Sequence, residues 1–297
     1  MEENPVPLTP RVTAILIAHN QAGEVRRAME ALERSRPSEQ LEILLVDCAS
    51  QDETPFLAEQ FPDITMQRLP QHFGATKALN IATRTARGDF LLLLSPAVEV
   101  PPELVNQLAA HLEESSDTAA VAPLLLDSEG RPALRYLQPL PDRESLVRLC
   151  AGGETVQLAL DLTQESVAVP YAGREALMVR KQFVAGMNYF DERFGEYWAD
   201  ADLAMKIRQA GKKIRLYPAI RATWHAAHNA APADTLHASD RIVGAAALLG
   251  KYQGFMAGFG FRWGQTLKAL MRLDFPLASA LLSGRKLGGE AKQSYPG

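Results

Sequence analysis

The sequence predicts an α/β protein with a doubly wound, mostly parallel sheet flanked by helices and followed by a C-terminal helical extension. Two observations support this fold class. Short continuous apolar runs, typical of strands buried on both faces, alternate with helical stretches of roughly 10 to 15 residues. This alternation indicates βαβ units, because parallel strands need a crossover between them. Beyond Ala238 the pattern is helical, interrupted by Gly254, Gly258, Gly260 and Gly264.

The first half of the chain contains four predicted strands, each followed by a predicted helix. The strands cover residues 12–18, 41–46, 64–69 and 90–94. The helices cover residues 23–34, a stretch opening near Asp52, and residues 74–86 and 102–115. Asp52 suits an N-cap because Pro55 fits a first helical turn, so we interpret Asp52 as structural. The run at 90–94 ends in Ser95-Pro96 and is the central buried strand.

The second half of the chain has a weaker pattern. It predicts a strand at 121–126, a tight turn at 127–130 and a helix at 143–149. A strand at 176–179, helices at 181–185 and 200–210, and short strands at 214–217 and 222–224 follow. The predicted division is a flexible lead-in at 1–10, a main domain at 11–237 and the helical extension at 238–297.

Composition and charge exclude several classes of protein. With 297 residues and 47% hydrophobic content, the chain can bury the core of one large domain. Its net charge of -4 provides no bulk attraction to nucleic acid. Cys48 and Cys150 fit no metal spacing, and Cys48 is interpreted as a small buried thiol. With no signal peptide and no membrane-spanning run, we expect a cytoplasmic protein, and one possible location for it is the inner face of the membrane.

The C-terminal extension has its own charge balance. From Arg241 onward, eight Lys and Arg residues face only Asp274 and Glu290, a surplus of six positive charges. Aromatic residues stand among the glycines, and apolar and basic residues then alternate. Residues 255–292 therefore fit a basic amphipathic helix at a membrane surface, a helix packed on its own domain, or a helix packed on a second subunit of a homodimer.

Polar residues follow the predicted strands, and ligands of open α/β sheets bind outside the carboxyl ends of strands. A carboxylate can accept hydrogen bonds from a base or ribose, a glycine permits close backbone approach, and a lysine can meet a phosphate. Each residue also has a structural alternative in a turn, a cap or a solvated helix face. The candidates for a nucleotide site at this edge are His19, Asn20, Asp47, Gly74, Lys77, Asn80, Ser95 and Ala97.

Residues 197–202 combine an aromatic pair with two carboxylates at the start of a helix. Asp200 and Asp202 do not share a helix face, so we expect them to have different roles. One fits a general base in a cleft and the other a helix cap, and Asp200 is the better base because Tyr197 and Trp198 precede it as an acceptor platform. His225 fits a metal ligand at a strand end, although with His228 it does not complete a zinc site.

Taken together, these stretches resemble glycosyltransferase family 2, the inverting nucleotide-sugar transferases of the GT-A fold, and most closely its rhamnosyltransferase-like branch. The resemblance covers about residues 11 to 228. The matching pieces stand in order at 12–20, 42–54, Gly74, Asn80, Ala86, Gly88-Asp89, 91–100, 121–131, 190–194, 200–211 and His225.

The resemblance implies roles for single residues. Asp47 matches the aspartate that holds uracil or thymine, Asp200 the base that deprotonates the acceptor hydroxyl, and His225 a metal ligand. It also implies a UDP- or dTDP-sugar donor, a glycan or lipid-linked acceptor and a role in polysaccharide biosynthesis. A divalent cation, Mg²⁺ or Mn²⁺, would neutralise the diphosphate leaving group.

Two departures from the family pattern bear on the metal. Ala97 stands where the last aspartate of the Asp-x-Asp motif binds the cation, and Ala199 replaces the glutamate before the catalytic aspartate. Because hard cations prefer oxygen ligands, a metal would then keep only His225 and phosphate oxygens. Three hypotheses follow: Lys77 or another cation bears the diphosphate charge, Glu99 binds metal weakly, or the chain has lost transfer and only binds its ligand.

The function predicted from the sequence is therefore an inverting glycosyltransferase. The alternative is a catalytically impaired paralogue that acts as a nucleotide-sugar- or carbohydrate-binding protein, since a fold alone does not decide between the two. A dehydrogenase or an α/β-hydrolase is not supported, because neither a Gly-x-Gly-x-x-Gly motif after the first strand nor a Gly-x-Ser-x-Gly motif occurs.

Overall fold

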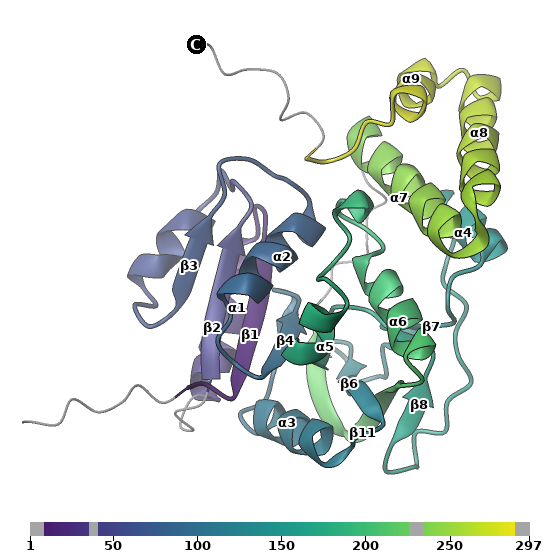
Figure 1. The fold of residues 1–297 in the computed structure, drawn as a ribbon. Helices are drawn as coiled ribbons and strands as arrows, with labels where there is room; N and C mark the ends of the chain where they lie inside the picture. The colour runs from purple at the N-terminus through teal and green to yellow at the C-terminus, as the bar shows by residue number, and fades with distance from the viewer. Residues whose placement is uncertain (1–8, 36–40, 226–233, 289–297) are drawn as a thin grey trace, which may run out of the picture.

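The computed structural model describes residues 9–35, 41–225 and 234–288. Residues 1–8 of the predicted lead-in, His228 and the chain beyond residue 288 lie outside the described residues. Figure 1 shows a sheet with helices packed against it and a group of three helices, α7 to α9, at one end. None of the helices in the described ranges is long and apolar enough to cross a membrane.

Nine strands of the described part of the chain form one mixed, mostly parallel sheet. Strands β1, β2, β3 and β4 run parallel, as do β6 and β11, whereas β5, β8 and β10 run antiparallel to their neighbours. This arrangement confirms the predicted fold class. The order is β3 (Thr65–Arg68), β2 (Leu41–Asp47), β1 (Val12–Ala18), β4 (Phe90–Leu94), β10 (Ala176–Arg180), β6 (Thr118–Leu126), β11 (Lys213–Trp224) and β5 (Val98–Glu99), with β8 (Val167–Val169) on β11.

The helices occupy most of the places that the sequence predicts. The turn at 127–130 is also present, because the amide of Gly130 donates to the carbonyl of Asp127 (2.9 Å). A short ribbon of β7 (Leu137–Gln138) and β9 (Tyr171–Ala172) lies apart from the main sheet. The helices are α1 (Ala22–Arg34), α2 (Ala75–Thr85), α3 (Leu104–Glu114), α4 (Arg143–Cys150), α5 (Lys181–Gly186), α6 (Ala199–Gln209), α7 (Thr235–Gln253), α8 (Phe255–Met271) and α9 (Phe275–Ser283), with 3₁₀ turns η1 (Thr54–Glu59), η2 (Leu134–Tyr136) and η3 (Glu192–Phe194).

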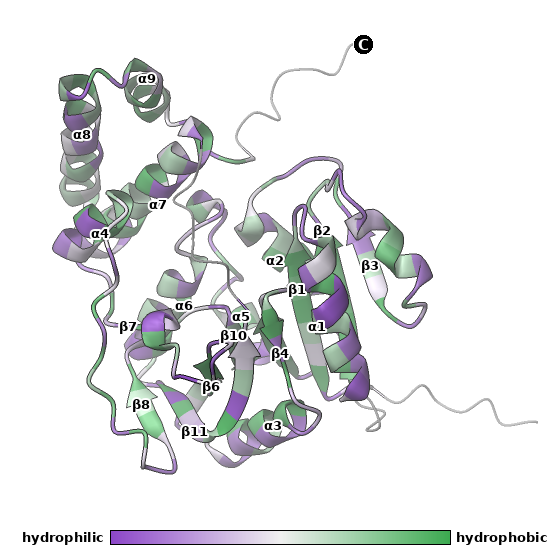
Figure 2. Ribbon diagram, turned by 180° about the vertical axis from the view of Figure 1, so that it is seen from behind, coloured by the Kyte–Doolittle hydropathy of each residue, from purple (hydrophilic) through white to green (hydrophobic). Residues whose placement is uncertain are grey.

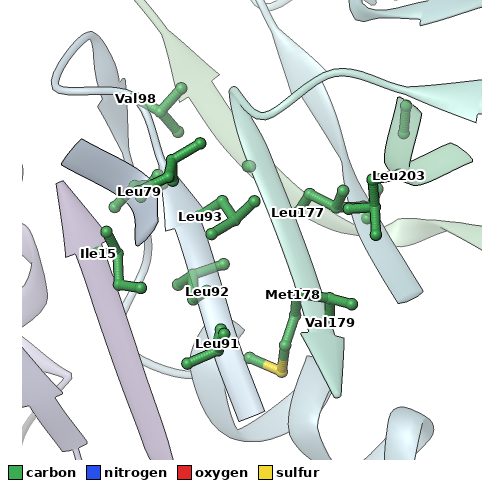
Figure 3. Close-up of a cluster of buried hydrophobic side chains, with 14 of the residues drawn as sticks. Ile15, Leu79, Leu91, Leu92, Leu93, Val98, Leu177, Met178, Val179 and Leu203 are labelled. Atoms are coloured by element: carbon green, nitrogen blue, oxygen red, sulfur yellow. The ribbon is translucent and has the colours of Figure 1, made fainter. Parts of the chain in front are cut away.

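Strand β4 lies in the core of the sheet, as its unbroken run of apolar residues predicts. Leu93 pairs with Ile15 of β1 on one side and with Leu177 of β10 on the other. Figure 3 shows the leucines of β4 packed between these two strands. All three residues are at most 1% exposed. Burial of side chains this size stabilises the fold by about 1.5–3 kcal/mol each, so β4 fixes the position of Ser95 to Ala97 at its end.

Four features of single elements differ from the sequence predictions or were left open by them. The segment opening near Asp52 is the 3₁₀ turn η1, and Asp52 instead accepts from the amides of Thr54 and Ala22, which joins η1 to α1. The two short strands at 214–217 and 222–224 are one strand, β11, with an irregularity between Tyr217 and Arg221. Strand β10 is antiparallel, although an apolar run alone suggests neither direction.

The fourth feature concerns the C-terminal glycines. Gly254 separates α7 from α8, but Gly258, Gly260 and Gly264 lie inside α8. Gly258 faces α7 so closely that a Cβ atom would stand 2.3 Å from the carbonyl oxygen of Ala246. Packing against α7 thus outweighs the helix-propensity cost of glycine, which is about 1 kcal/mol.

The two cysteines are buried and unpaired, as expected for Cys48. Burial raises the pKa of each thiol to about 12. Both thiols therefore stay protonated at neutral pH and are inert structural residues.

Candidate active site

A pocket of about 370 Å³ opens at the carboxyl ends of β1 and β4. This is the position at which open α/β sheets bind ligands. The end of β4 contributes Ser95, Pro96 and Ala97 to its wall, and the end of β11 contributes Trp224 and His225. Charged side chains come from other elements, namely Glu24, Arg174, Glu175 and Glu196.

Backbone hydrogen bonds hold the end of β4 in place. The amide of Ser95 donates to the carbonyl of Glu175 (2.9 Å), and the amide of His225 donates to the carbonyl of Ala97 (2.8 Å). The loop before β10 and the end of β11 thus meet at Ser95 and Ala97, which the sequence predicts to be site residues. Ser95, Ala97 and His225 lie together in the pocket wall.

Arg174 and Glu196 form a charged pair in the pocket. One guanidinium nitrogen of Arg174 lies 3.0 Å from Oε1 of Glu196. Oε2 of the same carboxylate accepts from the amide of Ala75 (2.8 Å), at the N-terminus of α2. Glu196 is therefore held by a cation and by the positive end of a helix, an environment that suits any anion.

Two glycines allow this contact between α2 and the loop that carries Glu196. Gly74 precedes α2 with φ of +83°, and a Cβ atom there would stand 2.9 Å from the carbonyl carbon of Gly195. Gly195 has φ of +59°, and its missing side chain leaves room for the carboxylate of Asp240. Gly74 thus serves close approach of backbone to backbone in this structure.

Asp200 lies at the start of α6, next to the pocket residue Arg174. Its Oδ2 accepts weakly from the amide of Arg174 (3.4 Å), and its Oδ1 accepts from the amide of Ala201 (3.0 Å). The hydroxyl of Tyr171 also bonds to this carboxylate. Asp200 is half-buried, so its carboxylate is oriented by three partners without being fully removed from solvent.

Glu175 is a second carboxyl group beside Asp200. Burial, and then the charge of Asp200, raises the pKa of Glu175 to about 7. Its Oε2 is buried and has no hydrogen-bond partner among the described residues. Two adjacent carboxyl groups do not ionise independently, so Glu175 still holds a proton part of the time near neutral pH.

The raised pKa of Glu175 predicts a pH-dependent effect of Glu175→Gln on stability. The unfolded chain loses this proton near the ordinary glutamate pKa of 4.5 and the folded chain near 7, so the group destabilises the fold progressively as pH rises between these values. The gain in Tm of Glu175→Gln over the natural chain should thus be at least about 2 °C larger at pH 8 than at pH 5. Thermal unfolding measures it, with exposed Glu59→Gln as the control; an equal gain at both pH values would contradict the prediction.

The residues at the expected metal position do not fit a protein-bound cation. Ala97 has no ligand atom, and the imidazole Nε2 of His225 lies 3.1 Å from Oε2 of Glu99. The other oxygen of Glu99 pairs with Arg34 (3.1 Å). Each of the two ligand candidates is therefore already bound to the other, and no third carboxylate, thiol or imidazole joins them within the described ranges.

The ends of β1 and β2 meet beside the pocket. His19 Nδ1 lies 2.8 Å from the carbonyl of Cys48, and the amide of Asn20 donates to Oγ of Ser50 (2.9 Å). Asp47 is fully buried, and its Oδ1 accepts from the amide of Ser50 (3.0 Å). Its Oδ2 has no hydrogen-bond partner among the described residues and lies 3.6 Å from Nε of Arg68.

Two predicted nucleotide-binding residues point elsewhere. Asn80 is buried and uses its amide to clamp the backbone of Phe190, donating and accepting at 2.9 Å. Lys77 places its ammonium group 3.9 Å from the ring centre of Phe73 and does not line the pocket. Both positions are explained by packing of α2, which a local pattern does not reveal.

The predicted acceptor platform also needs correction. Trp198 is 9% exposed, and its indole nitrogen donates to the carbonyl of Arg241 on α7 (2.8 Å). Asp202 is 1% exposed, and its carboxylate pairs with Lys251 of α7 (2.6 Å). Tyr197 is half-buried and is not among the residues that line the pocket. Trp198 and Asp202 therefore attach α6 to the C-terminal helices rather than contact an acceptor.

Sequence analysis missed Arg174, Glu175 and Glu196. The sequence contains one indication of them, because the charged residues Arg174 and Glu175 directly precede the apolar run at 176–179. It was not decisive, because a strand's first residues reach the ligand edge only when that strand is antiparallel to its neighbours. Pairing of β10 with β4 supplies that direction.

Comparisons with known proteins agree with the fold. Residues 13–153 match the family model of glycosyl transferase family 2. The fold is similar to S. aureus TarS 1-349 (15% identity, TM-score 0.55), covering 81% of this chain and 65% of that one. It is also similar to mannosyltransferase PcManGT from Pyrobaculum calidifontis, solved with GDP-Man and Mn²⁺ (18% identity, TM-score 0.56), covering 99% of this chain and 79% of that one.

No curated protein matches the chain by sequence comparison. At these identities the solved structures establish the fold, and the family match identifies the lineage of the segment that holds β1, β2 and β4. The match over residues 13–153 assigns this segment to glycosyl transferase family 2, and the solved structures show that the chain as a whole has the fold of these glycosyltransferases.

Proposed function

We propose that the chain is an inverting glycosyltransferase that moves a sugar from a UDP- or dTDP-sugar to a glycan or lipid-linked acceptor. The observation that carries the proposal is the carboxylate of Asp200, held next to a pocket at the carboxyl ends of β1 and β4. S. aureus TarS 1-349 has been solved with UDP and with UDP-GlcNAc, which supports a UDP-sugar. Rhamnosyl transfer from a dTDP-sugar remains a prediction from the sequence.

In the proposed reaction, Asp200 accepts the proton of the acceptor hydroxyl. The hydroxyl oxygen forms a bond to the anomeric carbon as the bond from that carbon to the diphosphate oxygen breaks. The diphosphate leaves with the bonding electron pair, and attack from the opposite face inverts the configuration. A positioned general base contributes about 10²–10⁴-fold to such a step.

The nucleobase has a candidate partner in Asp47. Its buried Oδ2 lacks a hydrogen-bond donor in the described part of the chain, an arrangement that costs about 1–3 kcal/mol unless a ligand supplies one. The N–H of a uracil or thymine ring is such a donor. His19 and Asn20 are bonded to the turn that follows Asp47 and are the further candidates for contact with the nucleotide.

Arg174 is the candidate partner of the diphosphate in place of a protein-fixed metal. It is the one lysine or arginine among the described residues that line the pocket. In the absence of a donor it pairs with Glu196, and a phosphate oxygen would take the place of that carboxylate. The charge-assisted hydrogen bonds that an arginine makes to phosphate contribute about 1.5–3 kcal/mol each.

The proposal predicts nucleotide binding that depends on Arg174 and not on a metal. Calorimetric titration with UDP, dTDP and their sugars should give the same affinity with manganese and with EDTA, and Arg174→Met should weaken it about tenfold or more. Lys77→Met and the exposed Arg131→Met are matched controls that should bind like the natural chain. Tight binding only with manganese would overturn the role of Arg174, and no binding of any nucleotide would overturn the proposed function.

A second candidate is a nucleotide-sugar- or carbohydrate-binding protein without transfer activity. Ala97 and Ala199, which replace two carboxylates of the family pattern, favour it. Nucleotide binding with normal affinity, but without sugar transfer from any donor that binds, would support this candidate.

A further inference from the structure

The second and third C-terminal helices expose an unusual amount of apolar surface. Of the twelve large hydrophobic side chains that are exposed in the described residues, ten lie between Phe255 and Leu282. Figure 2 shows α8 and α9 at the periphery of the molecule with mostly hydrophobic residues. We call this set the α8–α9 face: Phe255, Met256, Phe259, Trp263, Leu267, Leu270, Met271, Leu273, Phe275 and Leu282.

The α8–α9 face is not needed for packing within the chain. Helix α8 contacts the rest of the protein through its opposite side, where Gly258 meets α7 and Phe261 and Ala269 are buried. Arg262 donates to the carbonyl of Leu281 (2.6 Å) and so ties α8 to α9. The helix is thus firmly placed while its outer face stays open, and contiguous apolar patches of this kind mark interaction sites.

Aromatic rings form a row on this face. Phe255, Phe259 and Trp263 follow each other at four-residue spacing, with ring centres 6.0 and 6.4 Å apart. Their side chains are 76%, 53% and 58% exposed. Tryptophan and phenylalanine on one side of a helix are typical of helices that lie in the interface of a bilayer.

The charge of residues 255–288 indicates which kind of partner surface can bind the α8–α9 face. Residues 255–288 contain five Lys and Arg residues against Asp274 alone, in a chain whose net charge is -4. Lys268 and Arg272 are exposed on α8, away from the aromatic row, and Asp274 caps α9 through the amide of Leu277. An apolar face flanked by cations is complementary to anionic lipid headgroups above acyl chains.

We propose that the α8–α9 face docks the protein on the surface of an anionic membrane. Helix α8 has 17 residues and is therefore about 25 Å long, and it would lie in the plane of the interface. A second copy of the chain is the competing occupant of an apolar face. It fits less well, because a symmetric pair places two strongly basic segments against each other.

Docking in this way would hold the pocket next to the bilayer. Asp240 of α7 accepts from the amide of Glu196 in the pocket wall (2.8 Å) and from the amide of Leu287 after α9 (3.1 Å). This link attaches the C-terminal helices directly to the site. The consequence that a lipid-linked acceptor is presented there rests on the proposed function, whereas membrane docking itself does not.

Tryptophan fluorescence provides a direct test. Trp198 and Trp224 are 9% and 7% exposed, so a change on adding vesicles reports on Trp263. Vesicles of phosphatidylcholine and phosphatidylglycerol should shift the emission of the full chain to shorter wavelength and carry the protein into the pellet. Vesicles of phosphatidylcholine alone should bind at least about tenfold less, and added salt should weaken binding.

Variants locate the binding surface. Phe255→Ser with Phe259→Ser should reduce pelleting at least about tenfold, and Trp263 keeps the fluorescence signal in this variant. Phe56→Ser, which removes an equally exposed phenylalanine on η1, should pellet like the natural chain. Absence of pelleting by the natural chain would overturn the proposal. So would dimerisation in sedimentation velocity that the double variant abolishes while vesicle binding stays unchanged. Because none of these readouts uses a nucleotide, they can fail while the calorimetric test of the proposed function succeeds.

Discussion

Asp200→Asn should reduce sugar transfer by about 10²–10⁴-fold and leave the affinity for the nucleotide within about twofold. An asparagine keeps the shape and, through its single amide oxygen, the shorter hydrogen bond from the amide of Ala201, but it loses the weak bond from the amide of Arg174 and cannot accept a proton at neutral pH. The loss should therefore appear in kcat rather than in donor binding, because the base acts only as the hydroxyl is deprotonated.

The measurement is release of nucleoside diphosphate from whichever donor binds in the calorimetric titration, with unchanged Tm as evidence of folding. Asp127→Asn, in the turn after β6, is the control for the substitution itself. Glu175→Gln separates the two adjacent carboxyl groups. If Glu175→Gln loses turnover while Asp200→Asn keeps it, Glu175 is the base and the role carried over from the family pattern is wrong.

Asp202→Ala should lower the free energy of unfolding by about 3–5 kcal/mol without being part of the chemistry. The carboxylate is 1% exposed and lies 2.6 Å from Nζ of Lys251 and 3.4 Å from Nζ of Lys206. It also accepts from the hydroxyl of Tyr252 (2.7 Å). Its removal leaves the partly buried ammonium group of Lys206 without a counter-ion, leaves Lys251 paired with Asp191 alone (3.1 Å), and weakens the attachment of α6 to α7.

Denaturant unfolding followed by circular dichroism measures this loss, and the midpoint should fall without a change in slope. Asp161→Ala, at an exposed aspartate whose hydrogen bonds reach only Thr163 and Gln164, should cost less than about 1 kcal/mol. A similarly small cost for Asp202→Ala would show that the cluster with Lys251 does not hold the helices together.

Local patterns were sufficient for most of the sheet. Strands β1 and β4 have the predicted bounds, residues 12–18 and 90–94. Both strands are buried on both faces, so almost every residue in them is apolar and the run marks the whole strand. Helices with an apolar stripe, such as α1 and α2, were also placed within two residues. The positions of Ser95, Ala97 and His225 in the pocket wall could be predicted in the same way, because the ends of the strands in such a sheet form the wall of the pocket.

Roles of polar side chains were predicted less well, because a sequence shows what a residue can bind and not what lies beside it. Asn80 was predicted to contact the ligand, but in the structure its side chain bonds to the backbone of Phe190. Asp202 stands two residues after Asp200 at the start of the same helix, and the position of Lys251, far along the chain, shows that it forms a buried ion pair.

The apolar periodicity of the chain thus established the layers of the fold and the strand whose end carries Ala97, and the resemblance of its motifs to a known family indicated the fold family. Only the tertiary structure showed three further features: the direction of β10, the ion pair of Arg174 with Glu196, and the exposed apolar face of α8. The physical reason is one of range: burial imposes its pattern on neighbouring residues, whereas a charged or aromatic side chain acquires its role from partners that only the folded chain brings within a few ångströms.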